Sequence, residues 1–445
     1  MAHRLLRLLI ALTAIIGIAA IVLATQLSGR LPQSIELSAI DRAALSFRCE
    51  PSGPVRVHVQ TCLDGQLETM FENALTDAEH QSQLESDGTV FVQTGDIPYQ
   101  WERDSSAQVT PYLYFAKDSP AVATFLNRVI ERQAKALERH PYAAAFNIDY
   151  SVTWPRYELD SLLYPIQLAW QYWQMTGDNT VFTSNVYRGF AAALKTMLTE
   201  QNHNTQSKYT DPGLVKTPVA YTGMIWSAFR PSDLGMVYNY NIPGNMMAVV
   251  VLKELAQIEA DVYHDSGKAA ASLKLSSEVD QGIKQYGIVH SAEFGQVYAY
   301  EVDGLGHYVL MDDANIPSLL AAPYIGYVPA SDPTYQNTRR LLLSPADPYF
   351  YAGSLAGGIG SNNSPPGTVW PLSLLAQGLT TTGVAERQEM LKYLLASDPG
   401  DHLLHESFNV NNQKILTRPD FGWPNSLFAQ FIMVSFEGYE PLPHL

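Results

Sequence analysis

The chain has 445 residues, of which 46% are hydrophobic and 16% charged, and its formal net charge is −16 at pH 7. This is enough apolar sequence for a large core in one or two domains. The acidic balance excludes nucleic acid as a partner, because nucleic-acid binding needs a basic surface. The 25 Tyr and 7 Trp supply rings that can pack a core or line a binding site.

The N-terminal segment combines two arginines with a long apolar run. Arg4 and Arg7 precede the apolar residues 8–24, which is typical of a signal peptide or of an uncleaved anchor that tethers the protein to a membrane. A buried helix of the folded domain is the alternative, although the run shows no amphipathic period. Both arginines lie before the run, so the remainder is expected to be exported, into the periplasm or an extracellular or lumenal space. We therefore expect residues 1–27 to be the targeting or anchoring segment and residues 28–48 to be a linker.

The chain contains only two cysteines, Cys49 and Cys62. They flank a Pro/Gly turn and the alternating run "VRVHV", and in an exported protein two such cysteines are expected to form a disulfide. Two unpaired thiols are the alternative. A zinc site is not indicated, because one cysteine pair supplies too few sulfur ligands.

From residue 66 onward the apolar residues recur mainly at helical spacing. Ser119 and Pro120 are typical of a helix start, and Gly177 is typical of a helix end. Alternation replaces the helical period in one place, residues 287–302, which predicts a β-hairpin. The predicted helices span residues 67–78, 105–117, 119–139, 158–177, 180–202, 243–263, 266–286, 313–327, 333–344, 369–382, 384–396 and 424–437.

The loops that precede every second predicted helix are long and rich in charged and aromatic residues. They span residues 94–104, 147–157, 221–241, 301–312, 350–368 and 398–422. In a toroid of six helical hairpins, alternate helices line the inside, so these loops would meet at one end of the barrel. We therefore predict an all-α fold, an (α/α)6 barrel with a minor β-hairpin, that forms one domain of residues 49–445 with its binding site at that end.

The first of these loops places four candidate binding residues within nine positions: Asp96, Trp101, Arg103 and Asp104. Asp104 has a structural alternative as a helix N-cap or as the partner of Arg103 in an ion pair. The functional interpretation is sugar binding, because a sugar offers hydroxyl groups to charged side chains and a C–H face to an aromatic ring.

The later loops repeat this mixture of acids, arginines and rings. The candidates are Arg230, Asp233, Asp312, Asp313, His405, Glu406, Arg418 and Trp423. Asp233 has an alternative as a turn residue, and the pair at 312–313 has alternatives as a helix cap or a calcium ligand. No H-E-x-x-H or G-x-G-x-x-G motif is present. Two carboxylic acids across a pocket are what glycosidic bond cleavage requires.

Several motifs, in order, resemble those of glycoside hydrolase family 125, the exo-α-1,6-mannosidases. They are "TGDIPYQWERDSSAQVTPY", "WSAFRPSD", "MDDANIPSLLAAPYIGY", "VWPLSLLAQGL" and "HESFNVNNQKILTRPDFGWPNSLFAQFI", and the similarity runs from about residue 66 to residue 437. The resemblance implies an (α/α)6 barrel that works without a metal or other cofactor and inverts the anomeric centre.

The resemblance also implies roles for individual residues. Asp233, in "RPSD", would be the general acid, and Glu406, in "HESF", the general base. The family usually has a second Asp where this chain has Leu234, so Asp233 is the acid retained. The terminal mannose would be bound by Arg103, Asp104, Asp312 and Asp313.

The sequence thus predicts a metal-independent, inverting exo-α-1,6-mannosidase that releases terminal mannose from an α-mannoside oligosaccharide or glycan. The alternative is a non-catalytic mannan-binding protein built on the same barrel.

Overall fold

The computed structural model describes residues 65–211 and 217–445. The predicted targeting segment, the linker and the Cys49–Cys62 pair lie outside the described residues, and all three remain predictions. Within the described part of the chain, no helix is long and apolar enough to cross a membrane.

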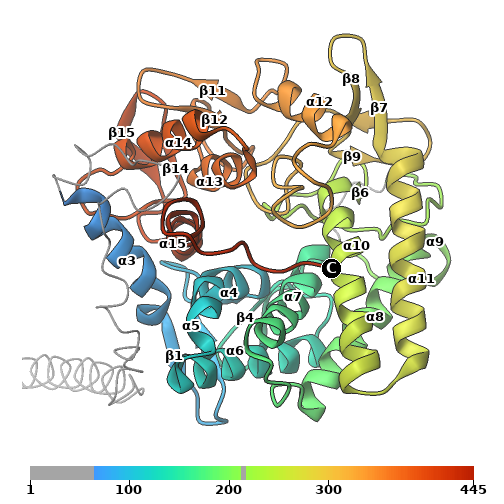
Figure 1. The fold of residues 1–445 in the computed structure, drawn as a ribbon. Coiled ribbons are helices and arrows are strands. Elements are labelled where there is room, and N and C mark those ends of the chain that lie inside the picture. The colour runs from blue at the N-terminus through green and yellow to red at the C-terminus, as the bar shows by residue number, and fades with distance from the viewer. Residues whose placement is uncertain (1–64, 212–216) are drawn as a thin grey trace, which may run out of the picture.

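The helices form two concentric rings (Figure 1). The outer ring contains α3 (Gln66–His80), α6 (Pro120–Arg139), α8 (Ser184–Gln201), α11 (Ser266–Gly282), α12 (Pro333–Leu342) and α14 (Val384–Ala396). The inner ring contains α4 (Glu102–Val109), which continues through η2 (Thr110–Tyr112) into α5 (Leu113–Ala116), then α7 (Leu159–Thr176), α10 (Ile242–Gln257), α13 (Pro371–Thr380) and α15 (Gly422–Phe436). Short helical turns, α9 (His203–Gln206), η3 (Ile258–Val262) and η4 (Ile283–Gly287), extend three of these helices.

Burial distinguishes the two rings. The outer helix α6 buries mainly one stripe, which includes Val122, Phe125 and Val129 and follows the predicted helical spacing. The inner helix α7 is buried without interruption from Leu159 to Tyr172, as expected of a helix that is packed on all sides. Consecutive helices therefore alternate between the outside and the inside, and the (α/α)6 barrel is confirmed.

The predicted helix ends are also found. The Ser119 hydroxyl accepts the N–H of Val122 at 3.4 Å at the start of α6, and Gly177 ends α7 with a left-handed φ of 73°. The predicted β-hairpin is present as β7 (Ile288–Ser291) and β8 (Gly295–Tyr298), paired antiparallel.

The predicted helix over 313–327 is wrong, because this segment folds as a series of turns. Pro317 and Pro323 have no N–H to donate to a helix. The Asp312 carboxylate accepts the N–H groups of Leu319 and Leu320, both at 2.9 Å, so these donors are turned toward a side chain. The segment nevertheless occupies the sixth inner position and is buried from Met311 to Ala322.

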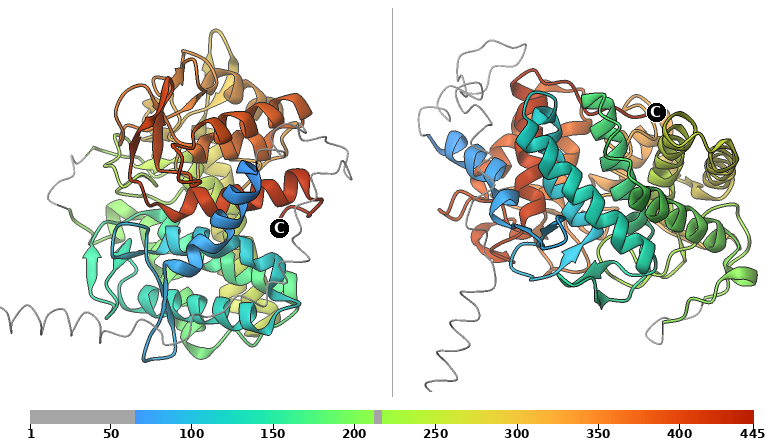
Figure 2. Two further views of the ribbon diagram at one scale, coloured as in Figure 1. Left: turned by 90° about the vertical axis from the view of Figure 1, so that its left-hand side faces the viewer. Right: turned by 90° about the horizontal axis from the view of Figure 1, so that it is seen from below.

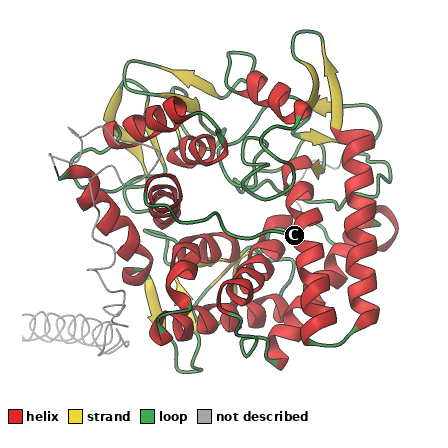
Figure 3. Cartoon of the chain, in the orientation of Figure 1, coloured by secondary structure: helices red, strands yellow, loops and turns green. Residues whose placement is uncertain are grey.

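Short strands connect the crowded loops to one another (Figure 3). One sheet joins β3 (Gln100–Trp101), β4 (Ala145–Phe146) and β5 (Val152–Trp154); a second joins β6 (Tyr240–Asn241), β9 (Glu301–Val302) and β10 (Tyr308–Val309); a third joins β13 (Thr368–Val369), β14 (Ser407–Asn409) and β15 (Asn412–Thr417). Two further hairpins are β1 (Ser82–Leu84) with β2 (Val90–Val92), and β11 (Phe350–Ala352) with β12 (Gly357–Ile359). Each three-stranded sheet thus pairs two crowded loops.

Backbone contacts close these pairs into a ring. Phe229 N donates to Tyr157 O at 3.2 Å, between the second and third loops. Ala314 N donates to Gly360 O at 3.2 Å, and Asp96 N donates to Asp420 O at 3.0 Å, from the first loop to the last. The crowded loops therefore meet at one end of the barrel, as the sequence predicted. Figure 2, left, shows their strands toward one side of the molecule and the C-terminus toward the other.

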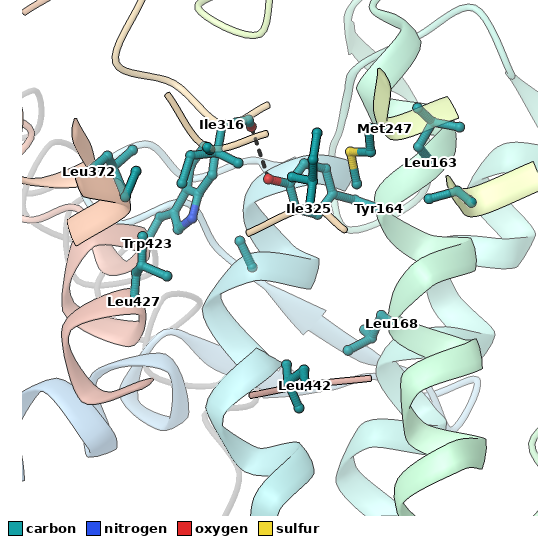
Figure 4. Close-up of a cluster of buried hydrophobic side chains, with 14 of the residues drawn as sticks. Leu163, Tyr164, Leu168, Met247, Ile316, Ile325, Leu372, Trp423, Leu427 and Leu442 are labelled. Carbon is teal, nitrogen blue, oxygen red and sulfur yellow. Dashed lines mark hydrogen bonds between the residues drawn. The ribbon is translucent and has the colours of Figure 1, made fainter. Parts of the chain in front are cut away.

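The inside of the barrel is filled by side chains (Figure 4). Tyr164 donates its hydroxyl to Ile316 O at 2.9 Å, next to Trp423 and Leu372. The end opposite the crowded loops contains a cavity of about 270 Å³, which is partly walled by Leu442 near the C-terminus.

Candidate active site

A cleft opens among the crowded loops. It is lined by Thr94, Ile97, Trp101, Arg103, Asp104, Pro231, Ser232, Asp233, Asn315, Asn363, Trp370, Glu406, Arg418 and Phe421. Arg103 and Glu406 lie far apart in the sequence but in the same cleft, as the predicted arrangement requires. Trp101 supplies an aromatic wall and packs against Trp154 with ring centroids 6.1 Å apart.

Arg103, in the first turn of α4, is the centre of a buried acidic cluster. Its Nη1 donates to Glu158 Oε2 and to Asp160 Oδ2, both at 2.8 Å, and its Nη2 donates to Asp233 Oδ1 at 3.1 Å. Asp104 Oδ2 lies 3.4 Å from Nε. Burial alone would lower the pKa of Arg103, but Asp160 and the other carboxylates outweigh it and raise that pKa.

The other acids of this cluster are fully buried. Burial raises the pKa of Asp104 to about 6, against the opposing effect of Arg103. Burial also raises the pKa of Asp160 and, more strongly, that of Glu158. One guanidinium facing four carboxyl groups is an unusual excess of acid for a buried site.

Asp233 points its carboxyl group into the cleft from a strained turn. Its φ is 61°, a left-handed value that is uncommon for any residue with a Cβ. Asp233 N donates to Arg230 O at 2.9 Å, and Arg156 Nη1 donates to Asp233 O at 3.0 Å. The side chain is 28% exposed, in contrast to the acids around Arg103. The turn thus presents one carboxyl group at the mouth of the acidic cluster.

Glu406 lies directly before β14 and faces Arg418. Burial raises the pKa of Glu406, whereas Arg418, with Nη1 3.7 Å from Oε1, opposes that rise. Arg418 also contacts Asp96 Oδ1 at 2.8 Å and donates to Thr94 O at 2.7 Å. Asp96 therefore sits at the rim of the cleft and holds the arginine beside Glu406.

Several predicted binding residues lie behind the cleft wall. Asp313 accepts from the hydroxyls of Ser232 and Ser361 at 2.8 and 3.1 Å, and Asp312 caps the turns that precede α12. The further residues that lie behind the wall are Arg230, paired with Glu301; His405, whose Nδ1 is 2.8 Å from Pro419 O; and Trp423, whose ring centroid lies 5.9 Å from the Arg103 guanidinium carbon.

Residues 230, 312, 313, 405 and 423 are not among the residues that line the cleft, and each contacts neighbouring protein groups instead. The reason is that membership of a loop does not fix which way a side chain points. Their assignment as binding residues stays a prediction.

Three residues of the site, Arg156, Glu158 and Asp160, were not predicted from the sequence. Both acids fall at the predicted start of a helix, where an acidic side chain ordinarily stabilises the helix N-terminus and has no further role. The available signal was their position directly after a crowded loop.

Within residues 65–211 and 217–445, no group of three or more His, Cys, Asp or Glu side chains is arranged to hold a metal ion. The acids that gather in the cleft face Arg103 and Arg418 instead.

The sequence profile of the metal-independent alpha-mannosidases, GH125, matches residues 64–433. The chain belongs to this family. A member from Streptococcus pneumoniae, solved as a non-productive substrate complex with alpha-1,6-mannobiose, is 37% identical, with a TM-score of 0.82 over 85% of this chain and 96% of the other. The chain is thus a GH125 glycoside hydrolase.

Two further comparisons give one sequence relative and one structural neighbour of the GH125 chain. The "Meiotically up-regulated gene 157 protein" of Schizosaccharomyces pombe is 36% identical, over 86% of this chain and 84% of that protein. A bacterial glucoamylase complexed with acarbose has a TM-score of 0.62 at 13% identity, over 85% of this chain and 58% of the other. At that identity the likeness shows only the shared barrel fold.

Proposed function

We propose that the protein is an inverting exo-α-mannosidase that removes terminal mannose from α-1,6-linked glycans. The observation that carries this proposal is the position of Asp233 and Glu406, which come from different loops and line one cleft in a GH125 barrel. The α-1,6 linkage is supported by the mannobiose bound to the Streptococcus pneumoniae relative.

The cleft suits the end of a glycan chain. Its floor contains the buried Arg103, and Trp423 lies beneath that arginine. Trp423 packs beside Tyr164 and Leu427 (Figure 4), and these three side chains also line the cavity at the opposite end of the barrel. A cleft closed at its floor accepts a terminal sugar rather than the middle of a chain, which supports exo cleavage.

In the proposed reaction, Asp233 gives its proton to the glycosidic oxygen while the bond from that oxygen to the anomeric carbon breaks. Glu406 takes a proton from a water molecule, whose oxygen attacks the anomeric carbon from the opposite face. Arg103 stabilises the Asp233 carboxylate that forms, because its Nη2 already contacts Oδ1. Arg418 favours the ionised form of Glu406 that the base requires.

The test is proton NMR of the purified protein with α-1,6-mannobiose. Inversion gives β-mannose as the first product. Initial appearance of α-mannose would mean retention and would remove Glu406 from its role as a base acting on water. Binding of the disaccharide without any release of mannose would favour the alternative, a non-catalytic mannan-binding protein.

Export and the disulfide are part of the same proposal, on the strength of Arg4 and Arg7 ahead of residues 8–24. Protease added to intact cells, with any outer envelope permeabilised, is expected to digest the domain. Thiol titration of the unfolded, unreduced protein is expected to find neither Cys49 nor Cys62 free. Full protection from protease, or two reactive thiols, would contradict the respective expectation.

A further inference from the structure

The carboxyl groups of Glu158 and Asp233 both accept hydrogen bonds from the guanidinium of Arg103. Arg103 Nη1 donates to Glu158 Oε2 at 2.8 Å, while Nη2 donates to Asp233 Oδ1 at 3.1 Å. The other oxygen of Glu158, Oε1, is buried and has no donor. The two carboxyl groups thus lie against one guanidinium, and the charge of Asp233 raises the pKa of Glu158. Because an ionised carboxylate only accepts, two carboxyl groups can form a hydrogen bond only when one of them carries a proton.

The backbone fixes this contact. Glu158 forms a parallel bridge with Phe229, four residues before Asp233, and Leu159 N donates to the Ser227 hydroxyl at 3.2 Å. Arg156, two residues before Glu158, donates to Asp233 O at 3.0 Å. The segment that carries Glu158 and the turn that carries Asp233 are therefore joined on both sides of the contact.

The surrounding charges favour a retained proton. Burial raises the pKa of Glu158 well above its ordinary value, and the charge of Asp233 raises it further. The other charged or titratable groups that face the pair are Arg103 and Asp104 from α4, Asp160 from α7, Arg156 and Tyr209 beside the turn, and Glu406 and Arg418 from the last crowded loop. The carboxyl groups outnumber the arginines, so complete ionisation would leave uncompensated negative charge in a buried site.

We propose that Glu158 and Asp233 form a carboxyl pair that shares one proton at neutral pH, which makes Glu158 the positioning residue that keeps the general acid supplied with its proton. The proposal rests on the proposed function of Asp233. A second carboxyl group in contact opposes the loss of the last proton, because two adjacent negative charges repel.

The proton balance of the cycle is simple. Asp233 transfers the shared proton to the glycosidic oxygen, and Glu158 and Asp233 are then both carboxylates beside the Arg103 guanidinium. After the products leave, a proton returns from solvent to the pair, while Glu406 releases to solvent the proton that it took from water. No other reactant is needed.

The activity test compares Glu158→Gln with Asp160→Asn. Both replace a carboxylate that accepts from Arg103 Nη1 at 2.8 Å with its neutral amide, but the charge of Asp233 is a leading influence on the pKa of Glu158 and a minor one on that of Asp160. In Glu158→Gln, the alkaline fall of kcat/KM is expected to move to lower pH by about one unit or more, since the neighbouring charge is gone. The acid fall should stay in place, and the shift in Asp160→Asn should be clearly smaller. No shift, or equal shifts in both variants, would overturn the proposal.

A second measurement does not depend on activity. The infrared C=O band of protonated carboxyl groups at neutral pH is expected to be weaker in Glu158→Gln than in the unsubstituted protein. An unchanged band would mean that Glu158 is ionised and would overturn the pair. If the unsubstituted protein released no mannose, the proposed function would fail, while the infrared comparison would still decide whether the proton is shared.

Glu158→Asp is a more conservative variant, for the case that Glu158→Gln does not fold. It keeps a charge partner for Arg103 but withdraws the carboxyl group from Asp233 by one methylene. Both readouts are expected to change in the same direction as in Glu158→Gln, to a smaller extent, with a melting curve close to that of the unsubstituted protein. Readouts that stay unchanged in a folded Glu158→Asp protein would count against the pair.

Discussion

The two candidate catalytic acids sit in different surroundings, and each difference suits a role. Asp233 stands on a turn with φ of 61°, and Arg103 contacts one of its oxygens. Strain of this kind costs on the order of 1 kcal/mol or more and persists only where the surroundings hold it in place. Glu406 is buried beside Arg418. The acid is thus held at the mouth of the acidic cluster around Arg103, and the base is held beside a cation.

Replacing either acid by its amide tests these roles. Asp233→Asn and Glu406→Gln are each expected to lower kcat by about 10²–10⁴-fold, because a neutral amide can neither donate nor accept the proton. The measurement is mannose release from α-1,6-mannobiose. Asp118→Asn, at an exposed position between α5 and α6, is the matched control and should keep full activity. Near-normal turnover by Asp233→Asn would assign the acid to another residue.

The pH dependence of kcat/KM tests the surroundings of Glu406. The base acts when ionised, so activity is present above its pKa and lost as pH falls through it. Because burial raises that pKa above 4.5, the fall should occur at a higher pH than for an exposed glutamate. Arg418→Gln removes the opposing charge and should move the fall to still higher pH. The control is Arg188→Gln, since Arg188 is a surface residue paired with Glu138, and it should leave the profile unchanged.

At the scale of elements, the sequence predicted long periodic segments well. The stripe of α6, its Ser119 cap and the Gly177 stop of α7 lie where local chemistry puts them. The 313–327 segment was predicted wrongly because its apolar spacing is helical, while its prolines and the buried Asp312 carboxylate redirect its N–H groups. Apart from β7 and β8, the strands were missed, because most of them have only two or three residues and are too short to show alternation.

Only part of the candidate site, likewise, could be predicted from the sequence. The loops that hold Arg103, Asp233, Glu406 and Arg418 could be predicted from their composition and from the family resemblance. The cluster around Arg103 could not, because it brings together residues up to 130 positions apart. Glu158 looked like part of a helix start, and only the fold shows that it faces Asp233.

The packing of α8 on α6 depends on a glycine. A Cβ at Gly189 would lie 2.3 Å from Ala134 O, which is backbone and cannot move aside. Gly189→Ala is therefore expected to push the helices apart and to lower the free energy of unfolding by about 1–3 kcal/mol. Gly267→Ala is the matched control, because Gly267 is an exposed helical glycine of α11 at which an added Cβ would meet no neighbour closer than 3.5 Å.

Gly267→Ala should be neutral or slightly stabilising, since alanine is the better helix former. Urea unfolding of the two variants decides the comparison. Equal midpoints would show that the outer helices tolerate a wider spacing than the close approach at Ala134 indicates.

At the scale of the whole molecule, the two ends of the barrel differ: one carries the cleft, and the other is closed by the C-terminal residues. The ring of hydrogen-bonded loops builds the cleft at one end. At the other end, the residues after α15 cross between the inner helices (Figure 1). There Gln171 Nε2 donates to Pro443 O at 3.4 Å, and His444 Nδ1 lies 3.6 Å from the buried Glu254 Oε1. The C-terminal residues therefore help to close the cavity that lies beneath the floor of the site.

Two leucines of the C-terminal segment, one buried and one exposed, test whether this segment stabilises the fold by closing the cavity. Leu442 is 7% exposed and lines the cavity, whereas Leu445 is 50% exposed. Leu442→Ala is expected to lower the free energy of unfolding by roughly 2–5 kcal/mol, because it removes buried methyl groups beside an existing void. Leu445→Ala should leave unfolding unchanged. Urea denaturation measures both, and mannose release at room temperature should be equal in the two variants, since the cleft lies at the opposite end. Loss of activity in Leu442→Ala without loss of stability would instead mean that the far end of the barrel communicates with the floor at Trp423 and Arg103.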